Sequence, residues 1–96
     1  MSESLRSIAS GIDFSPGQIV YAEATPELKE DLLQVVYPDG QTLDVGWYPE
    51  GDPKGEYRIL VVSDGDWDTP LLDLSTAEEQ RLTELILEAA NTIRRI

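Results

Sequence analysis

The sequence predicts an α+β fold, in which a four-stranded antiparallel meander sheet packs one face against one long C-terminal amphipathic helix. Runs of alternating apolar and polar residues recur between residues 18 and 63. Turn signals rich in Pro, Gly and Asp separate these runs. Residues 75–96 instead carry apolar side chains at helical spacing. The chain has 96 residues, which is the length of a single domain, 1–96.

A short helix is expected near the N-terminus, over residues 4–12. Its apolar residues would share one helical face: Leu5, Ile8, Ala9 and Ile12. The sequence Ser15-Pro16-Gly17 then predicts a turn.

Four strands are predicted next: Gln18 to Ala24, Leu32 to Tyr37, Gln41 to Tyr48 and Tyr57 to Ser63. Pro38-Asp39-Gly40 is a strong hairpin signal between the second and the third. The fourth strand is apolar on both faces, which indicates a central, well-covered position. Residues 69–74 are expected to form at most a short extended piece, which Pro70 would confine to a sheet edge.

The C-terminal helix has the clearest local signals. Ser75 followed by Glu78 has the spacing of a capping box, which predicts the helix start. One stripe of the helix is apolar: Leu82, Leu85, Ile86, Ala89, Ile93 and Ile96. We expect the first four of these to pack on Val35, Val45, Trp47, Ile59 and Val61.

The opposite sheet face is predicted to be more apolar than a solvated face should be. It carries Val20, Leu32, Val36, Tyr48, Leu60 and Val62. Either the N-terminal segment or another chain would cover this face, so we hypothesise a homodimer.

Charge and composition narrow the function by exclusion. With 7 Lys and Arg against 19 Asp and Glu, the net charge is −12. Such a charge repels phosphate backbones and anionic lipid, so neither nucleic acid nor a membrane is an expected partner. A basic partner protein or a divalent cation remains compatible with it.

The chain contains no cysteine and no histidine. Thiolate and imidazole metal sites are thereby excluded, and so are the commonest nucleophile–base pairs. We therefore expect no cofactor, and a binding role is favoured over catalysis. The N-terminus lacks the layout of a signal peptide and no apolar run is long enough to span a membrane, so the expected location is cytoplasmic.

Two carboxylate-rich loops, 49–55 and 64–68, are the predicted contacts of a basic partner. The predicted binding residues are Glu50, Asp52, Asp64, Asp66, Trp67 and Asp68. Trp67 would either tuck back over the helix–sheet interface or stand out as a partner anchor, and tucking is favoured because tryptophan is mostly buried.

Asp64, Asp66 and Asp68 also begin like a calcium-binding loop, since three carboxylates at alternate positions in a turn can converge on Ca²⁺. The pattern then fails, with Thr69 at the sixth position and Ser75 at the twelfth. An acidic exposed turn is the favoured interpretation. The predicted function is thus a small acidic protein-binding or regulatory module, with a calcium-binding domain or an accessory subunit of a larger assembly as alternatives.

Overall fold

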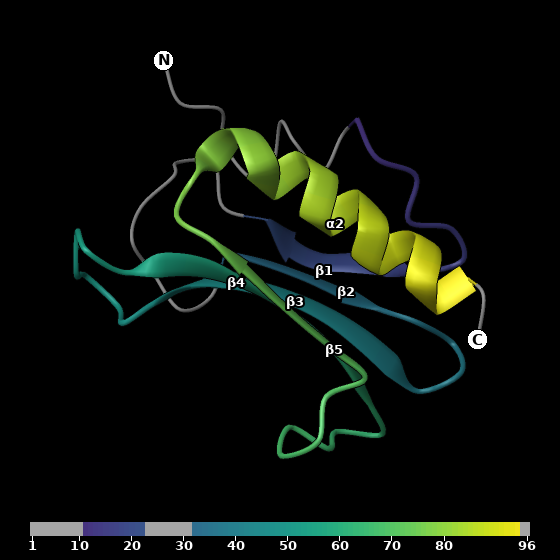
Figure 1. Cartoon of the computed structure of the whole chain (residues 1–96). Helices are drawn as coiled ribbons and strands as arrows, with labels where there is room; N and C mark the ends of the chain where they lie inside the picture. The colour runs from purple at the N-terminus through teal and green to yellow at the C-terminus, as the bar shows by residue number, and fades with distance from the viewer. Residues whose placement is uncertain (1–10, 23–31, 95–96) are drawn as a thin grey trace.

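The computed structural model describes residues 11–22 and 32–94, and these form one antiparallel sheet with one helix (Figure 1). The strands are β1 (Gln18–Ala22), β2 (Leu33–Val36), β3 (Gln41–Tyr48), β4 (Glu56–Ser63) and β5 (Leu72–Thr76). The helix α2 spans Glu79–Arg94. Among the described residues, no helix is long and apolar enough to cross a membrane.

The sheet is a meander in which the spatial order follows the chain, β1-β2-β3-β4-β5. The β3–β4 hairpin is the longest pairing, with Gln41 opposite Ser63 at one end and Tyr48 opposite Glu56 at the other. The predicted β2–β3 hairpin forms around Pro38-Asp39-Gly40, and the backbone N–H of Tyr37 donates to the carbonyl of Gln41 at 2.8 Å. Gly40 has a φ of 91°, which an L side chain rarely adopts, and this explains why glycine ends the turn.

The sheet has five strands rather than the predicted four. The segment after Pro70, expected to be a short edge piece, continues to Thr76 and pairs with β4 along its length. Its edge position is as predicted, since among the strands of the described residues β5 has only β4 as a neighbour in the sheet. The prolonged strand also makes the predicted capping box at Ser75 wrong, because Ser75 lies in β5 opposite Arg58.

Helix α2 begins at Glu79, three residues later than the predicted cap implies. At this end the hydroxyl of Thr76 accepts a hydrogen bond from the N–H of Glu78 at 3.0 Å. A serine or threonine side chain that bonds the backbone two residues on forms a turn of its own. The chain therefore passes from β5 into α2 through this turn, and the predicted capping box does not form.

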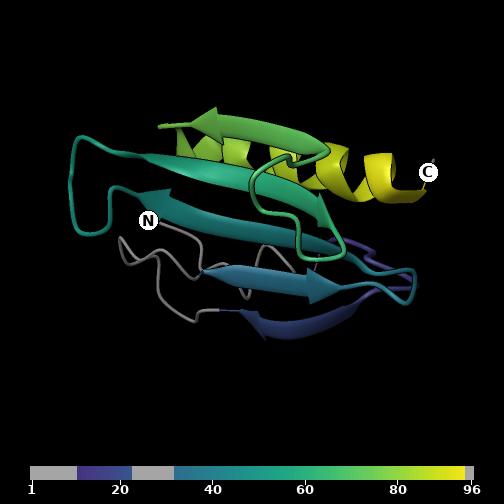
Figure 2. The ribbon, with the colours of Figure 1, turned by 90° about the horizontal axis from the view of Figure 1, so that it is seen from below.

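Helix α2 covers one face of the sheet and closes the hydrophobic core (Figures 1 and 2). The predicted apolar stripe is confirmed for Leu82, Leu85, Ile86, Ala89 and Ile93, all of which are buried. Their partners in one continuous cluster include the predicted residues Val35, Val45, Trp47, Ile59 and Val61. Ile96 and most of the predicted helix at 4–12 lie outside the described residues, and Gly11 and Ile12 form a turn and a bend.

The other sheet face is partly covered within the described part of the chain. Leu60 and Val62 are buried, and Leu32 belongs to the core instead. Loop 64–71 extends beneath this face at the end of β4 (Figures 1 and 2). Exposed apolar side chains remain at Val20 and Val36, on the β1 side of the sheet.

Candidate functional site

The two acidic loops lie at opposite ends of the molecule. Loop 49–55 joins β3 to β4, and loop 64–71 joins β4 to β5, so the full length of β4 separates them. Eight residues of strand span about 25 Å, at about 3.3 Å per residue. Figure 2 shows the first loop at the left end of the sheet and the second toward the right. The structure therefore does not bring the six predicted binding residues together, and one compact contact cannot include them all.

Loop 64–71 is tied to the turn that contains another exposed carboxylate, Asp39, which was not among the predicted binding residues. The backbone N–H of Asp64 donates to the carbonyl of Gly40 at 2.9 Å, which ties the β4–β5 loop to the β2–β3 turn. We call the unit formed by residues 38–40 and 64–68 the acidic tip. It contains four exposed aspartates: Asp39, Asp64, Asp66 and Asp68.

The backbone of the acidic tip is held in a defined shape. Asp64 adopts a left-handed φ of 53° and Gly65 a φ of 74°. Asp and Asn are the side-chain-bearing residues that accept this conformation most readily, so an Asp-Gly pair suits the turn. The N–H of Asp66 donates to the carbonyl of Ser63 at 3.1 Å and closes the turn.

Asp66 is fixed by a second loop contact. Its carboxylate accepts hydrogen bonds from the hydroxyl and the backbone N–H of Thr69. The hydrogen bond from the Thr69 side chain is the main reason why the pKa of Asp66 lies below its ordinary value. Asp66 therefore keeps its negative charge to a lower pH than a free aspartate would.

The carboxylates of the tip do not form a metal site. In the described part of the chain, no group of three or more His, Cys, Asp or Glu is placed to hold a metal ion. Asp66 turns its oxygens toward Thr69 instead. The geometry gives no support to the calcium site predicted at Asp64, Asp66 and Asp68.

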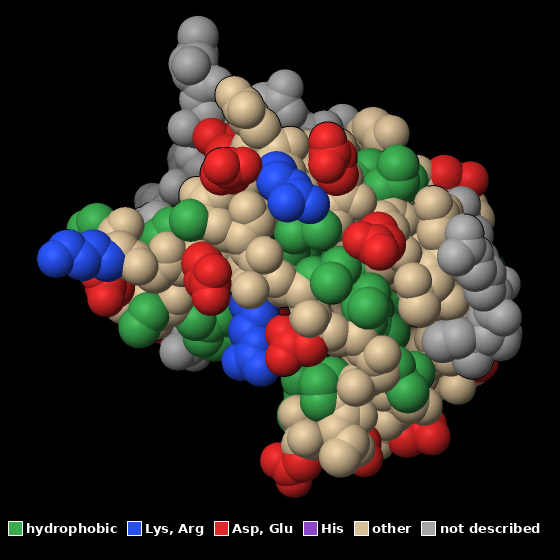
Figure 3. Space-filling view, in the orientation of Figure 1, with side chains coloured by type: hydrophobic (Ala, Val, Ile, Leu, Met, Phe, Trp, Pro, Cys, Tyr) green, Lys and Arg blue, Asp and Glu red, His purple; other side chains and the backbone are tan. Residues whose placement is uncertain are grey.

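Trp67 stands out from the acidic tip. Its side chain is 49% exposed, so the expectation that it would tuck over the helix–sheet interface is wrong. The reason is the position of the loop, which extends away from α2 at the end of the sheet (Figure 1). In Figure 3, acidic side chains gather around this lower end of the molecule.

Loop 49–55 contacts the core through Asp52, one of the predicted binding residues. The backbone carbonyl of Asp52 accepts a hydrogen bond of 2.7 Å from the indole N–H of Trp47, which is buried in the core. The carboxylate of Asp52 accepts from the N–H of Lys54 at 2.9 Å. Glu50 is exposed, but Lys54 adds a positive charge to the same loop. This loop is therefore a weaker candidate than the tip for contact with a basic surface.

A further carboxylate, Asp73 on β5, is engaged by the guanidinium of Arg58 on β4. Two hydrogen bonds of 3.0 and 2.7 Å join them side by side across the strands. These bonds lower the pKa of Asp73 from its ordinary value. A general acid at neutral pH needs a raised carboxyl pKa, and the shifts at Asp66 and Asp73 both go downward.

Comparison of the chain with models of protein families, with curated proteins and with solved structures returned no match.

Proposed function

We propose that this protein is a binding module that uses the acidic tip to engage a basic surface on a partner protein, with Trp67 as the apolar anchor. The observation that carries the proposal is the half-exposed indole of Trp67 in the same tip as four exposed aspartates. The chain has no Lys or Arg between residues 30 and 53 or between 59 and 80, so both segments of the tip are free of positive charge in sequence.

Physical reasons support each part of this surface. Tryptophan is enriched among the residues that dominate interface energetics, and such residues are surrounded by contacts that exclude water. Acidic rims accelerate association with basic partners and select against acidic ones. The hydrogen bond between Thr69 and Asp66 orders the rim before binding, which lowers the entropy lost on association.

We propose the cytoplasm as the compartment of this interaction. A chain without cysteine is compatible with a reducing compartment, in which disulfides rarely persist.

The test compares two variants with the same change in net charge. Asp64→Asn with Asp68→Asn neutralises the tip, while Glu84→Gln with Glu88→Gln neutralises exposed positions on α2. Each protein is immobilised, exposed to lysate of the native host and eluted with rising salt. We expect wild type and the helix variant to retain a basic protein released at moderate salt, and the tip variant to lose it. The Trp67→Ala variant should also fail to retain this basic protein.

Equal losses in the tip and helix variants would show that only the total charge matters and would overturn the proposal. Retention by the tip variant and by Trp67→Ala would place the interaction elsewhere on the molecule.

A further inference from the structure

One edge of the sheet is suited to accept another strand. β1 lies at the end of the strand order, and within residues 11–22 and 32–94 no strand pairs with its outer side. Its sequence, Gln-Ile-Val-Tyr-Ala, has no charged residue, and Val20 is 58% exposed. Exposed edge strands without charge are templates for pairing with another chain. The other edge strand, β5, carries the charged Asp73 and follows Pro70.

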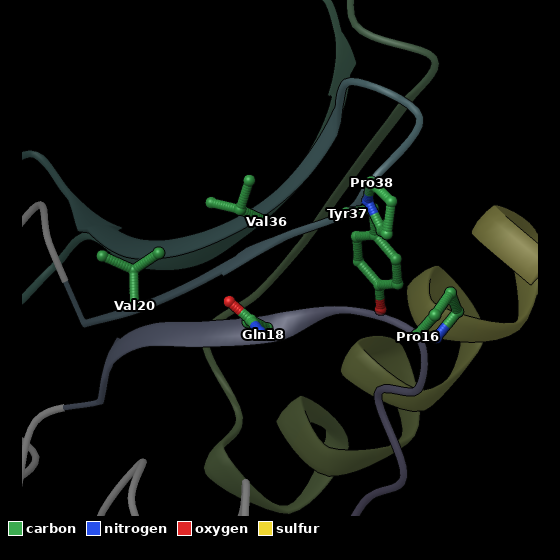
Figure 4. Close-up of a pocket in the computed structure, with 6 residues that line it drawn as sticks. All are labelled: Pro16, Gln18, Val20, Val36, Tyr37 and Pro38. Carbon is green, nitrogen blue, oxygen red and sulfur yellow. The ribbon is translucent and has the colours of Figure 1, made fainter.

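An open groove of about 450 Å³ lies beside this edge. Its lining is largely apolar and comes from the start of β1, the end of β2 and the turns beside them: Pro16, Gln18, Val20, Val36, Tyr37 and Pro38. Figure 4 shows Gln18, Val20 and Val36 projecting from the same side of the two strands, while the ring of Tyr37 points toward α2. The groove thus has room for an aliphatic side chain on the face of the sheet away from the helix.

The groove is continuous with the acidic tip. Pro38 lines the groove and is followed directly by Asp39. The next residue, Gly40, holds Asp64 through its carbonyl. Gln18 pairs with Val36, so β1 begins at the tip end of the sheet. A segment lying along β1 would therefore reach the carboxylates of the tip with one of its ends.

We propose that the partner presents an extended segment that adds to the edge of β1 as a sixth strand, places apolar side chains in the groove and directs Lys or Arg toward the acidic tip. This inference rests on the proposed function and specifies the partner's chemistry. Backbone hydrogen bonds along β1 would supply affinity, and the groove would supply specificity through alternate side chains. In the antiparallel orientation, which is slightly the more stable per residue, the basic residues would follow the apolar ones in the segment.

Charge favours this occupant over a second copy of the chain. Two copies that pair through β1 would bring together two bodies of net charge −12. The same negative potential that repels a second copy attracts a basic segment. The uncharged β1 lets the segment approach without burying an unpaired charge, while the neighbouring tip supplies the attraction.

The test uses synthetic peptides of about eight residues, the length of an ordinary strand. One alternates Val and Thr and ends in three lysines, and its control has the same lysines with two prolines within the apolar part. Each is titrated into the isotope-labelled full chain and followed by NMR. The first peptide should slow hydrogen exchange of the β1 amides that face away from β2, and it should shift the signals of β1 and the tip. The proline peptide should not protect β1, because proline cannot donate to a strand ladder.

Two variants with the same charge change separate edge pairing from general attraction. Val20→Lys places a cation on the exposed edge of β1, and Leu87→Lys places one on the 43%-exposed position of α2. We expect Val20→Lys to weaken binding of the first peptide by at least about tenfold. Leu87→Lys should weaken this binding by no more than about twofold.

Two results would overturn the edge pairing. Shifts confined to the tip, with β1 amides unchanged, would do so while leaving the proposed function intact. Protection, in the absence of peptide, of the β1 amides that face away from β2 would show that the edge is already occupied, by a second copy if the protection rises with protein concentration and by the chain itself if it does not. Failure of the proposed function would instead show as full partner retention by the tip variants in the lysate experiment.

Discussion

The backbone N–H of Asp64 lies 2.9 Å from the carbonyl oxygen of Gly40 and donates a hydrogen bond to it. Both residues have positive φ values, 53° for Asp64 and 91° for Gly40. Two connections that are distant in sequence are joined through this bond, so the β2–β3 turn and the β4–β5 loop act as one surface. The shape of the acidic tip depends on this pair.

Gly40→Ala should therefore impair partner binding more than it impairs folding. A methyl group at Gly40 would contact the carboxylate of Asp64, whereas one at Gly51, which also has a positive φ, would meet nothing within 4 Å. Each substitution should lower the free energy of unfolding by about 1 kcal/mol through backbone strain. Only Gly40→Ala should displace Asp64 and weaken binding, as measured by urea unfolding and by salt elution of the partner. Equal binding by the two variants would show that the position of Asp64 is unimportant.

The two tryptophans should respond oppositely to truncation. Trp47 is buried, its indole N–H donates to the carbonyl of Asp52, and its ring meets Tyr57 edge-on with centroids 4.8 Å apart. Trp47→Ala should cost about 3–5 kcal/mol of stability. Trp67→Ala should change stability by no more than about 0.5 kcal/mol, because its side chain is half exposed. A large loss of stability in Trp67→Ala would contradict its assignment as a surface anchor.

The ion pair of Arg58 and Asp73 should contribute to stability only above acidic pH. The pKa of Asp73 is lowered below its ordinary value of 3.8, mainly by the hydrogen bonds from Arg58. Because the pKa of Asp73 is lower in the folded state, the stabilisation is fully present at a pH above the pKa of the unfolded state. It disappears as the pH falls through the pKa of the folded state. Because the two side chains are 44% and 43% exposed, Asp73→Asn should cost no more than about 1 kcal/mol at neutral pH.

Urea unfolding of wild type, Asp73→Asn, Arg58→Gln and the double variant would measure this coupling. The coupling energy should shrink as the pH is lowered below 3.8. A coupling that stays constant into strong acid would exclude the carboxylate charge as its source.

Neighbouring helix positions should differ strongly in their effect on stability. Ile86 is fully buried against the sheet, while Leu87 is 43% exposed. Ile86→Ala should cost about 2–5 kcal/mol because it removes buried methyl groups and leaves a cavity. Leu87→Ala should cost no more than about 0.5 kcal/mol. Similar losses at the two positions in chemical unfolding would show that the exposed side of α2 is covered in solution.

Much of the fold follows from local patterns that tertiary contacts reinforce. The Pro38-Asp39-Gly40 turn and the apolar stripe of α2 agree with the packing, because each pattern matches the period of its element. The capping prediction failed because Ser75 and Glu78 satisfy the spacing of a box while β4 offers Ser75 a strand partner. Pairing with a neighbouring strand overrode a local preference that the sequence shows on its own.

The arrangement of the candidate site was only partly accessible from sequence. In a meander, successive connections alternate between the two ends of the sheet, so loops 49–55 and 64–71 have to lie apart once the strand order is known. By the same rule, the turn containing Asp39 lies at the end occupied by Asp64, and this signal was present in the predicted topology. The exposure of Trp67 could not be predicted from that topology, because it depends on the path of the loop beneath the sheet.

The unequal surroundings of Trp47 and Trp67 make the protein its own optical probe. An indole in the core emits at shorter wavelength and resists soluble quenchers, whereas one at a half-exposed tip emits to the red and is readily quenched. A Trp67→Phe variant would report only on unfolding, and wild type would add the signal of the tip. Occupation of the tip and loss of the fold can then be followed separately, by comparison of the two proteins, without any attached dye.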